Sequence, residues 1–374
     1  MWAIPAKPSA PTAARFTASS LASTSPATEH AGTGATHQRK LMSRALVIAP
    51  QWIGDAVMTE PLLRRLHGRG AALTVAAVPW VAPVYRAMPQ VAQVFELPFA
   101  HGGLQWGARR DMGRALRGQF DEAYVCPNSF KSALLPWWAG IPKRVGYLGE
   151  SRYGVLTQRL DNPTAGRHTP MVAFYSALSG DAGVGDDRPQ LHLDSVAVNA
   201  ALASMQLQPQ SYYVFAPGAE YGPAKRWPAK HFAVLAEQLD LPVVLLGSAG
   251  DAALCAEITH AVDAIKPGQC LNWAGRTMLD HAFAAIAAAK AVISNDSGLM
   301  HVAAAFTVPQ VALFGSSSPL HTPPLSPQAH VVWLKNNPLY LPALDCAPCF
   351  ARECPLGHTR CLVDIQPKDV LRFL

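Results

Sequence analysis

The sequence predicts an α/β protein made of two doubly wound domains that follow one another along the chain and face each other across a cleft. Short apolar runs alternate with helix-compatible stretches, and the alternation occurs in two series separated by a segment rich in Gly and Asp. Alternation of this kind is typical of βαβ units and a parallel sheet. The length of 374 residues also exceeds what one hydrophobic core usually holds, so two domains are expected.

The first series begins with an apolar run at 45–49, a polar turn and a helical stretch that ends near His67. Pro61 lies inside this stretch, and proline is tolerated in the first turn of a helix but not in its interior. We therefore expect a short turn after Gly54 and a new helix with Pro61 near its first position. Further strands are predicted at 73–78, 91–97 and 121–126, and helices at 81–88, 106–117 and 129–139.

The second series begins after the Gly/Asp-rich segment 180–189, which marks the predicted domain boundary. We place one domain at 42–190 and the other at 191–374. The second domain has predicted strands at 212–216, 242–246, 291–294 and 310–314, and predicted helices at 228–239, 251–262 and 279–289. Because ligands of open α/β sheets bind beyond the carboxyl ends of the strands, the cleft is the predicted small-molecule site.

Residues 1–41 differ in composition from the rest. They are rich in Ala, Ser, Thr and Pro, contain one acidic residue, Glu29, and show no hydrophobic periodicity from which a core could form. Met42, in contrast, opens a segment that leads directly into the first predicted strand. We expect residues 1–41 to be a disordered tail or the product of a misplaced translation start.

Charge and cysteine content limit the classes of function. The net charge of +6 favours an anionic partner, which includes nucleic acid, a membrane surface and a phosphorylated substrate. No apolar run reaches the roughly 18 residues that a membrane span needs. Seven Cys without a secretory signal favour a reducing compartment and free thiols. The expected protein is soluble and cytoplasmic.

The stretch 292–301 contains an apolar run that stops at a polar turn, Asp296-Ser297-Gly298. This pattern predicts a strand that opens into a helix, with N-cap residues at the turn. The free N–H groups and positive dipole end of such a helix favour a phosphate, so a diphosphate ligand is the first hypothesis. A capped helix without a ligand is the alternative from this stretch alone.

The turn after the first predicted strand carries Gly54 and Asp55. Asp55 is a candidate general base that deprotonates an acceptor hydroxyl, and the alternative is an N-cap Asp. Gly54 allows another backbone or a ligand to approach closely. The chain has neither GxGxxG nor GxxxxGK[ST], which argues against a dinucleotide fingerprint and a P-loop.

The loop 216–228 places Lys225 and Arg226 just before a predicted helix start at Pro228. Cationic side chains oppose the helix dipole at that place, which indicates an anion between them and the helix. A solvated basic loop is the alternative. Gly247-Ser248 opens another helix after the next strand, at the same edge of the sheet.

The C-terminal end is rich in cysteine and contains Cys346, Cys349, Cys354 and Cys361, with His358 among them. Thiolates in a tetrahedral arrangement bind zinc. The spacing is irregular and lacks paired C-x2-C knuckles, so we expect free thiols, with a structural zinc as the alternative.

Six strings occur in order along 42–374: Gly54-Asp55 within 45–66, P-N-S-F-K-S-A-L at 127–134, A-G-I-P at 139–142, R-V-G-Y at 144–147, P-G-A-E-Y-G-P-A-K-R-W-P at 217–228 and N-D-S-G-L-M-H at 295–301. Together they resemble the ADP-heptose:lipopolysaccharide heptosyltransferases of glycosyltransferase family 9. The second and fifth strings are most similar to the heptosyltransferase II members. One departure is Thr157-Gln158, where the family pattern has Asn-Asp.

This resemblance implies a two-domain GT-B glycosyltransferase that inverts the anomeric carbon, with no metal on the diphosphate and no further cofactor. It implies Asp55 as the base that activates the acceptor hydroxyl and Lys225 as the cation that stabilises the leaving ADP. The implied donor-binding residues are Glu220, Tyr221, Lys225, Arg226, Gly247, Ser248, Asp296, Ser297, Gly298 and His301, and the implied acceptor-binding residues are Asn128, Ser129, Lys131, Arg144 and Arg152.

The implied reaction moves L-glycero-D-manno-heptose from ADP-heptose to the first heptose of the lipopolysaccharide inner core. The implied partners are ADP-heptose and heptosylated Kdo2-lipid A, with peripheral contact at the cytoplasmic face of the inner membrane and no nucleic acid. One alternative is a heptosyltransferase I or III with a different acceptor. An alternative of another class is a non-catalytic zinc- or nucleic-acid-binding protein, for which only the charge and the cysteines argue.

Overall fold

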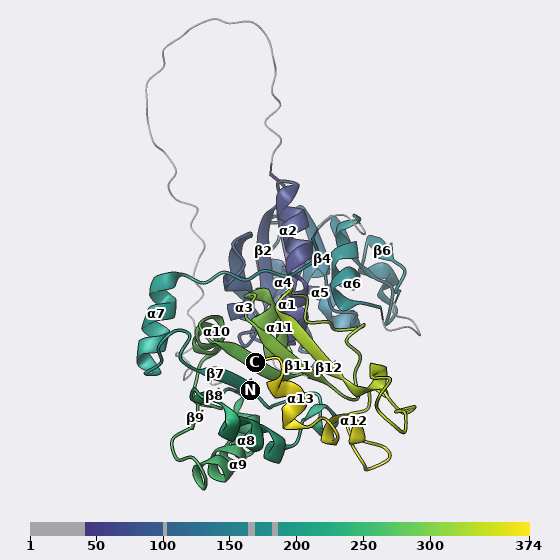
Figure 1. The fold of residues 1–374 in the computed structure, drawn as a ribbon. Coiled ribbons are helices and arrows are strands. Elements are labelled where there is room, and N and C mark those ends of the chain that lie inside the picture. The colour runs from purple at the N-terminus through teal and green to yellow at the C-terminus, as the bar shows by residue number, and fades with distance from the viewer. Residues whose placement is uncertain (1–41, 100–102, 164–168, 182–185) are drawn as a thin grey trace, which may run out of the picture.

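The fold consists of two six-stranded parallel sheets, one in each half of the chain, with helices on their faces (Figure 1). The computed structural model describes residues 42–374 apart from 100–102, 164–168 and 182–185. The strand orders are β3-β2-β1-β4-β5-β6 and β12-β11-β10-β7-β8-β9. Counted from its own first strand, each sheet therefore has the doubly wound order, in which the direction of winding reverses between the first and the fourth strand.

The N-terminal sheet forms from the first predicted series. Its strands are β1 (Arg44–Ile48), β2 (Ala72–Ala77), β3 (Val91–Glu96), β4 (Glu122–Val125), β5 (Lys143–Tyr147) and β6 (Gln158–Leu160). Its helices are α1 (Ile53–Met58), α2 (Glu60–Gly68), α3 (Ala82–Arg86), α4 (Trp106–Ala115), α5 (Phe130–Trp138) and α6 (Met171–Ser176), with short turns η1 (Arg152–Gly154) and η2 (Ala177–Ser179).

The C-terminal sheet forms from the second series. Its strands are β7 (Tyr213–Ala216), β8 (Val243–Leu245), β9 (Cys270–Asn272), β10 (Ala291–Asn295), β11 (Gln310–Phe314) and β12 (Ala329–Trp333). Its helices are α7 (Ser195–Ser204), α8 (Ala229–Gln238), α9 (Ala252–Asp263), α10 (Leu279–Ala287), α11 (Gly298–Ala305), α12 (Arg360–Val363) and α13 (Pro367–Leu371), with short turns η3 (Pro223–Lys225), η4 (Ala249–Asp251) and η5 (Leu334–Asn336).

The two faces of the C-terminal sheet belong to different cores. In β7, Val214 and Ala216 join the large core that also fills the N-terminal domain. Tyr213 and Phe215 join a second core that lies under α8, α9 and α13. Successive side chains of a strand point to opposite faces, so a strand buried on both faces has a continuous apolar run rather than an alternating one.

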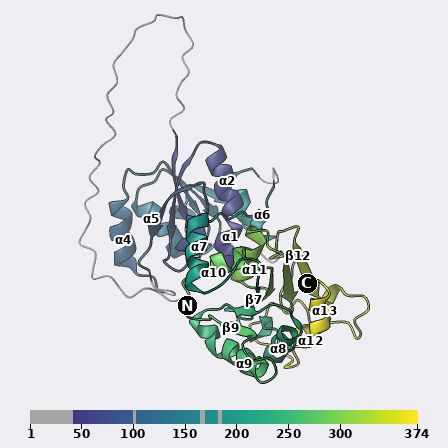
Figure 2. The same cartoon turned by 60° about the vertical axis from the view of Figure 1, so that its left-hand side comes forward.

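Helix α1 of the N-terminal domain lies against α11 of the C-terminal domain, and two views show them side by side (Figure 1, Figure 2). Glycines make this approach possible. A Cβ on Gly54 would lie 2.8 Å from Cδ2 of His301, and a Cβ on Gly298 would lie 2.9 Å from Cβ of Ile53. The close approach expected at Gly54 is confirmed, and the group that approaches is α11 of the other domain.

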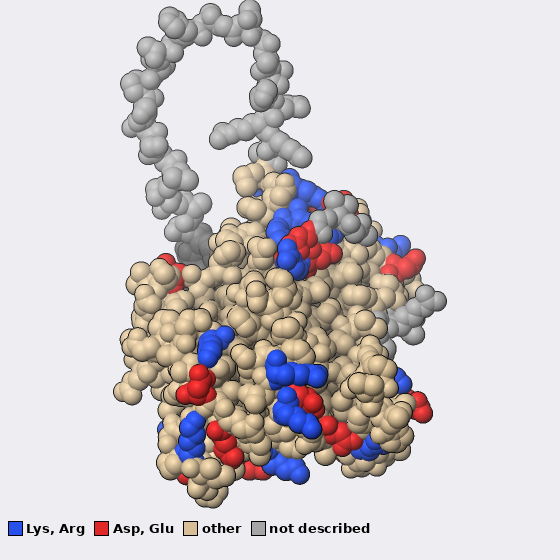
Figure 3. All heavy atoms as spheres, in the orientation of Figure 1, with Lys and Arg blue, Asp and Glu red and all other residues tan. Residues whose placement is uncertain are grey.

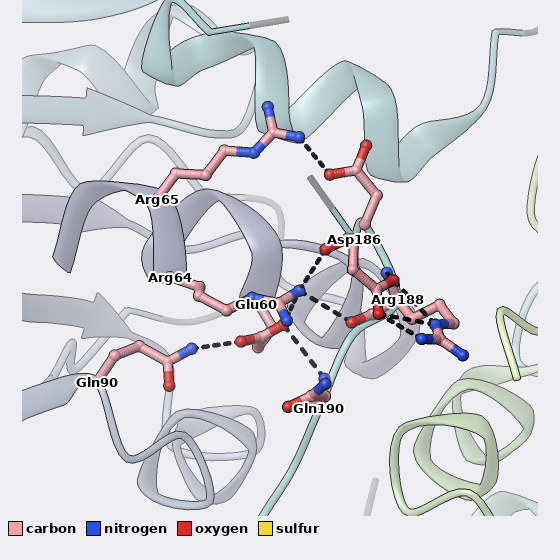
Figure 4. A network of polar contacts seen from close by, with 8 residues as sticks. Glu60, Arg64, Arg65, Gln90, Asp186, Arg188 and Gln190 are labelled. Carbon is pink, nitrogen blue, oxygen red and sulfur yellow. Dashed lines mark hydrogen bonds and ion pairs between the residues drawn. The ribbon is translucent and has the colours of Figure 1, made fainter. Parts of the chain in front are cut away.

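The segment that leads from the first domain to the second is fastened to α2 by charged side chains (Figure 4). The buried carboxylate of Glu60 accepts a hydrogen bond from the backbone N–H of Gln190 at 3.2 Å and pairs with Arg64 at 3.3 Å. Arg64 also donates to the backbone carbonyl of Asp186 at 2.8 Å. This network ties 186–190 to the helix that directly follows α1.

Some expectations about the first domain are confirmed and one is wrong. Pro61 is the second residue of α2, as expected for a helix start. The short turn predicted after Gly54 is instead a six-residue helix, α1, because the backbone N–H of Thr59 closes its last turn on Asp55 and the chain then continues directly into α2.

The predicted domain boundary at 190 stays a prediction, and residues 1–41 lie outside the described residues. Among the described helices, none has the length and apolar character that crossing a membrane requires.

Candidate active site

The polar turns singled out in the sequence lie where the strand order of each sheet reverses. The turns 51–55 and 127–129 follow β1 and β4, and the turns 217–227 and 296–298 follow β7 and β10. The carboxyl ends of parallel strands meet at one edge of a sheet, so each sheet brings two of these turns together. The contact between α1 and α11 then joins both pairs of turns in one site.

Asp55 is the third residue of α1 and is not its N-cap, since Trp52 occupies that position. The N-cap interpretation of Asp55 is therefore wrong. Its half-buried carboxylate accepts a hydrogen bond from the hydroxyl of Tyr175 in α6. Burial raises the pKa of Asp55 to about 6, although the Tyr175 hydrogen bond and the positive charge of Lys225 act in the opposite direction. A carboxylate with such a pKa is ionised at neutral pH and still accepts a proton readily.

Lys225 is the last residue of η3 and points toward the turn after β10. Its Nζ lies 2.6 Å from Oδ2 of Asp296, and the two side chains are only 17% and 5% exposed. The hydroxyl of Thr322 donates to the other carboxylate oxygen of Asp296 at 3.3 Å. The interpretation of Lys225 as part of a solvated basic loop is wrong, because this cation is largely buried and held in one direction.

Asn295 at the end of β10 holds the loop 217–227 in place. Its Nδ2 donates to the carbonyl of Pro217 at 2.7 Å, and its Oδ1 accepts from the backbone N–H of Trp227 at 3.0 Å. The next turn leads into α11, whose N-cap is Ser297, and this side chain makes no capping hydrogen bond. The first N–H groups of α11 are thus not capped by Ser297, and such groups suit an anion.

A cavity of about 250 Å³, the interdomain cavity, lies where the two domains face each other. From the N-terminal domain it is lined by Gln51, Trp52, Ile53, Gly54 and Trp80. From the C-terminal domain it is lined by Ala216, Gly218, Glu220, Leu246, Gly247, Ser248, Asp251, Ser297, Gly298 and Leu299. Half of the predicted donor-binding residues therefore line it, namely Glu220, Gly247, Ser248, Ser297 and Gly298.

One further predicted donor-binding residue, Arg226, lies next to this lining. Arg226 approaches Oδ1 of Asp251 at 3.7 Å, while Oδ2 of Asp251 accepts from the backbone N–H and the hydroxyl of Ser248 at 3.0 and 2.8 Å. Tyr221 instead donates its hydroxyl to the carbonyl of Phe350 at 2.9 Å, so it faces the C-terminal loop.

His301 fills the contact between the domains rather than the cavity lining. Burial lowers its pKa to about 4, because the charged imidazolium is disfavoured away from water. The imidazole is therefore neutral at physiological pH and packs against Gly54 as an uncharged ring.

A second cavity of about 260 Å³, the N-domain cavity, lies at the carboxyl edge of the N-terminal sheet. Asp55, Tyr175, Ser129, Lys131 and Arg109 are among its lining residues. It shares Gln51 and Trp52 with the interdomain cavity. The two cavities thus meet at the turn 51–55, next to Asp55.

The other predicted acceptor-binding residues hold the protein's own backbone. Arg152 is fully buried and donates to the carbonyl of Pro127 at 2.8 Å and to Oδ1 of Asn128 at 3.2 Å. Arg144 donates to the carbonyl of Val155 at 2.6 Å. Asn128, Arg144 and Arg152 line neither cavity. We therefore leave the two arginines out of the acceptor site.

The four C-terminal cysteines line one small cavity together with His358. All four are free thiols. Burial raises the pKa of Cys361 to about 11, whereas backbone N–H groups outweigh burial at Cys354 and lower its pKa. Within the described part of the chain, no three His, Cys, Asp or Glu side chains are arranged to hold a metal ion.

The arrangement of two doubly wound domains around an interdomain cavity has a counterpart among solved structures. The ADP-heptose lps heptosyltransferase II of E. coli matches with a TM-score of 0.75 and 40% identity, over 88% of this chain and 97% of that chain. The fold is therefore that of the GT-B glycosyltransferases, as predicted from the sequence.

The chain belongs to glycosyltransferase family 9, the heptosyltransferases, whose sequence model matches residues 109–359. It is 42% identical over 348 residues to lipopolysaccharide heptosyltransferase 2 of Escherichia coli K12, which covers 88% of this chain and 97% of that protein. It is 40% identical over 346 residues to lipooligosaccharide heptosyltransferase 2 of Haemophilus influenzae, with the same coverage of 88% and 97%. The predicted family and the predicted class of enzyme are both confirmed.

Sequence reasoning missed three residues of the site: Tyr175, Arg109 and Asn295. Tyr175 and Arg109 come from helices whose apolar and polar residues gave no sign of a site. Asn295 lies within the stretch 292–301, but its role depends on the distant loop 217–227. For Asn295 the burial of a polar side chain at a strand end was an available signal, since such a group needs hydrogen-bond partners.

Proposed function

We propose that this enzyme transfers L-glycero-D-manno-heptose from ADP-heptose to the first heptose of the lipopolysaccharide inner core. The observation that carries the proposal is the meeting of two cavities at the turn 51–55, where Asp55 lies in the lining of the N-domain cavity and the charge of Lys225, from the other domain, acts on the Asp55 carboxylate. The names of the relatives, heptosyltransferases 2, support the same donor and the same step. We place ADP-heptose in the interdomain cavity and the acceptor saccharide in the N-domain cavity.

Asp55 acts as the general base in this mechanism. The acceptor hydroxyl attacks the anomeric carbon of the donor heptose, its proton passes to the carboxylate, and the bond from that carbon to the β-phosphate oxygen breaks with inversion. Because its pKa is about 6, Asp55 is largely ionised at neutral pH and ready to accept the proton. The hydrogen bond from Tyr175 fixes the direction of the carboxylate.

Lys225 stabilises the departing ADP. Negative charge grows on the β-phosphate oxygen as the bond breaks, and the ammonium group together with the first N–H groups of α11 supplies positive charge there. Asp296 holds Nζ of Lys225 at 2.6 Å, which keeps the cation oriented. These groups support a reaction with no metal on the diphosphate and no further cofactor.

The remaining donor contacts follow from the lining of the interdomain cavity. The carboxylate of Glu220 accepts hydrogen bonds from donor hydroxyl groups, and Gly247 and Ser248 present backbone at close range. Arg226 lies beside this loop and adds positive charge. In the N-domain cavity, Ser129 and Lys131 contact the acceptor.

We also propose that the surface formed by α4 and α5 contacts the cytoplasmic face of the inner membrane. Trp106 and Trp137 are 49% and 42% exposed, and both pack against Trp138, at 4.7 and 5.7 Å between ring centroids. Arg114 and Arg117 are exposed on and just after α4. Tryptophan rings suit the membrane interface and arginines suit anionic headgroups. Figure 2 shows both helices on one outer side of the N-terminal domain.

Membrane contact is tested by sedimentation with vesicles that contain anionic lipid. We expect the enzyme to sediment with them and the double variant W106A/W137A to remain in the supernatant while still transferring heptose to a deacylated acceptor. Equal sedimentation of both proteins would exclude this surface.

Nucleic-acid binding is the alternative of another class, and the face drawn in Figure 3 gives it little support. Figure 3 shows one face of the molecule, where Lys and Arg side chains lie beside Asp and Glu side chains and form no continuous basic stripe. A nucleic-acid site needs a concentrated positive potential.

The choice of acceptor is tested with the purified enzyme and ADP-heptose. We expect efficient transfer to a lipid A core that carries one heptose and essentially none to the heptose-free Kdo2 core, because the hydrogen-bonding groups of the site remain unpaired without that sugar. Efficient transfer to the heptose-free core would show that this enzyme uses the acceptor of heptosyltransferase I. Transfer to neither would contradict the proposed function.

A further inference from the structure

Arg109 is a buried cation in the N-domain cavity, and the mechanism does not use it. It lies on α4, is 5% exposed and is one of the residues that line this cavity. Arginine is almost never fully buried without a partner of opposite charge. Within the described part of the chain, however, Arg109 forms no ion pair.

The contacts of Arg109 with the protein satisfy only part of its guanidinium group. Nε donates to the carbonyl of Leu104 at 2.8 Å, and Nη1 donates to the carbonyl of Lys131 at 3.4 Å. The carbon at the centre of the group lies 4.0 Å above the ring of Phe99. An arginine has five N–H donors, so three of them have no partner among the described residues. Among the described residues, the contacts of this planar group use two of its donors and one face.

Cations outnumber acids among the described residues that line this cavity. Its lining contains the cations Arg109 and Lys131 and one acid, Asp55. Burial lowers the pKa of Arg109, and no carboxylate contributes in the opposite direction.

We infer that Arg109, with Lys131 beside it, forms a subsite that binds an anionic group of the acceptor saccharide while the acceptor hydroxyl lies at Asp55. This inference rests on the proposed function and specifies how the acceptor is recognised. The group is a carboxylate or a phosphate monoester, since the fork of an arginine binds both. A charged contact at Arg109 and the base at Asp55, both in the lining of this cavity, orient the sugar between them.

The test compares Arg109→Gln with Arg110→Gln, which changes the exposed neighbour on the same helix. The acceptor is the deacylated heptosyl-Kdo2 saccharide, and KM and kcat are measured for acceptor and for ADP-heptose. We expect Arg109→Gln to raise the acceptor KM about 10- to 100-fold, the range for a hydrogen bond to a charged group, and to leave the ADP-heptose KM unchanged. Arg110→Gln is expected to behave as the unaltered enzyme, and Arg109→Lys to lie between the two because the charge remains but the fork does not.

Neutral acceptors separate recognition from a purely structural role. With the Kdo carboxyl groups converted to methyl esters, or with a phosphate removed from the heptose, the unaltered enzyme should lose the same factor that Arg109→Gln loses with the charged acceptor. The variant itself should not distinguish charged from neutral acceptor. The modification that reproduces the loss identifies the anion as carboxylate or phosphate.

Two results would overturn the inference: an equal loss by Arg109→Gln on charged and neutral acceptors, or no loss at all. The first would make Arg109 a support for the segment at Leu104. Failure of the unaltered enzyme to transfer heptose to any of these acceptors would instead refute the proposed function.

Discussion

Replacing Tyr175 by Phe tests whether Asp55 is a base whose proton affinity is set by its neighbours. The substitution removes one hydroxyl in a buried position and leaves the ring in place. The hydroxyl donates a hydrogen bond to the Asp55 carboxylate, and this bond favours the ionised form. Without it, burial dominates further and the pKa of Asp55 rises above its value of about 6.

The size of the effect follows from the energy of that hydrogen bond. A hydrogen bond to a charged group contributes about 1.5–3 kcal/mol, and each pKa unit corresponds to about 1.4 kcal/mol, so we expect a rise of roughly one to two units. In the unaltered enzyme about nine-tenths of Asp55 is ionised at pH 7, and in Tyr175→Phe roughly a half to a tenth. Transfer at pH 7 should therefore fall about two- to tenfold.

The assay is the pH dependence of kcat/KM with ADP-heptose and a heptosylated acceptor. The unaltered enzyme should lose activity as the pH falls through about 6, because the carboxylate becomes protonated. In Tyr175→Phe this loss should begin at higher pH, and activity should recover at pH 9. Tyr85→Phe is the matched control. The buried hydroxyl of Tyr85 forms its hydrogen bond with the hydroxyl of Thr59, at 3.1 Å, whereas the side-chain hydrogen bond that shifts the pKa of Asp55 comes from Tyr175. An acid limb that stays at the same pH in Tyr175→Phe, or moves equally in Tyr85→Phe, would refute the reasoning.

Three further predictions concern the same site. Asp55→Asn should lower kcat by on the order of 10²–10⁴ while ADP-heptose still binds in a calorimetric titration; unchanged turnover would remove Asp55 from catalysis. Lys225→Ala should lower kcat by on the order of 10²–10³ and weaken the binding of ADP. Lys230→Ala, on the exposed face of α8, should change neither kcat nor ADP binding. Normal kinetics for Lys225→Ala would place the diphosphate elsewhere. Gly298→Ala puts a Cβ 2.9 Å from α1 and should lower kcat/KM by about tenfold to a hundredfold through displaced helices; an unaffected variant would show that the contact is not needed for transfer.

The sequence by itself determined the class of fold and the positions of the polar turns. Apolar runs of strand length alternate with helical stretches, and this local periodicity is visible without any tertiary contact. Pro61 predicted the start of α2, because proline restricts its own backbone wherever it occurs and is tolerated in the first turn of a helix. Since both sheets are parallel, the turns after the strands had to gather at their carboxyl edges, which is why Asp55 and the 296–298 turn were recognisable as site candidates.

Only the tertiary structure decided which side chains face the cavities. Arg152 and Lys131 come from the same part of the chain and carry the same charge. Arg152 nevertheless donates a hydrogen bond to the carbonyl of Pro127, whereas Lys131 lines the N-domain cavity. Tyr175 contacts Asp55 across 120 residues of sequence, and Arg109 becomes a binding candidate only because no acid of the described segments pairs with it. These properties depend on the distances between segments that are remote along the chain, and a local pattern of residue types carries no information about such distances.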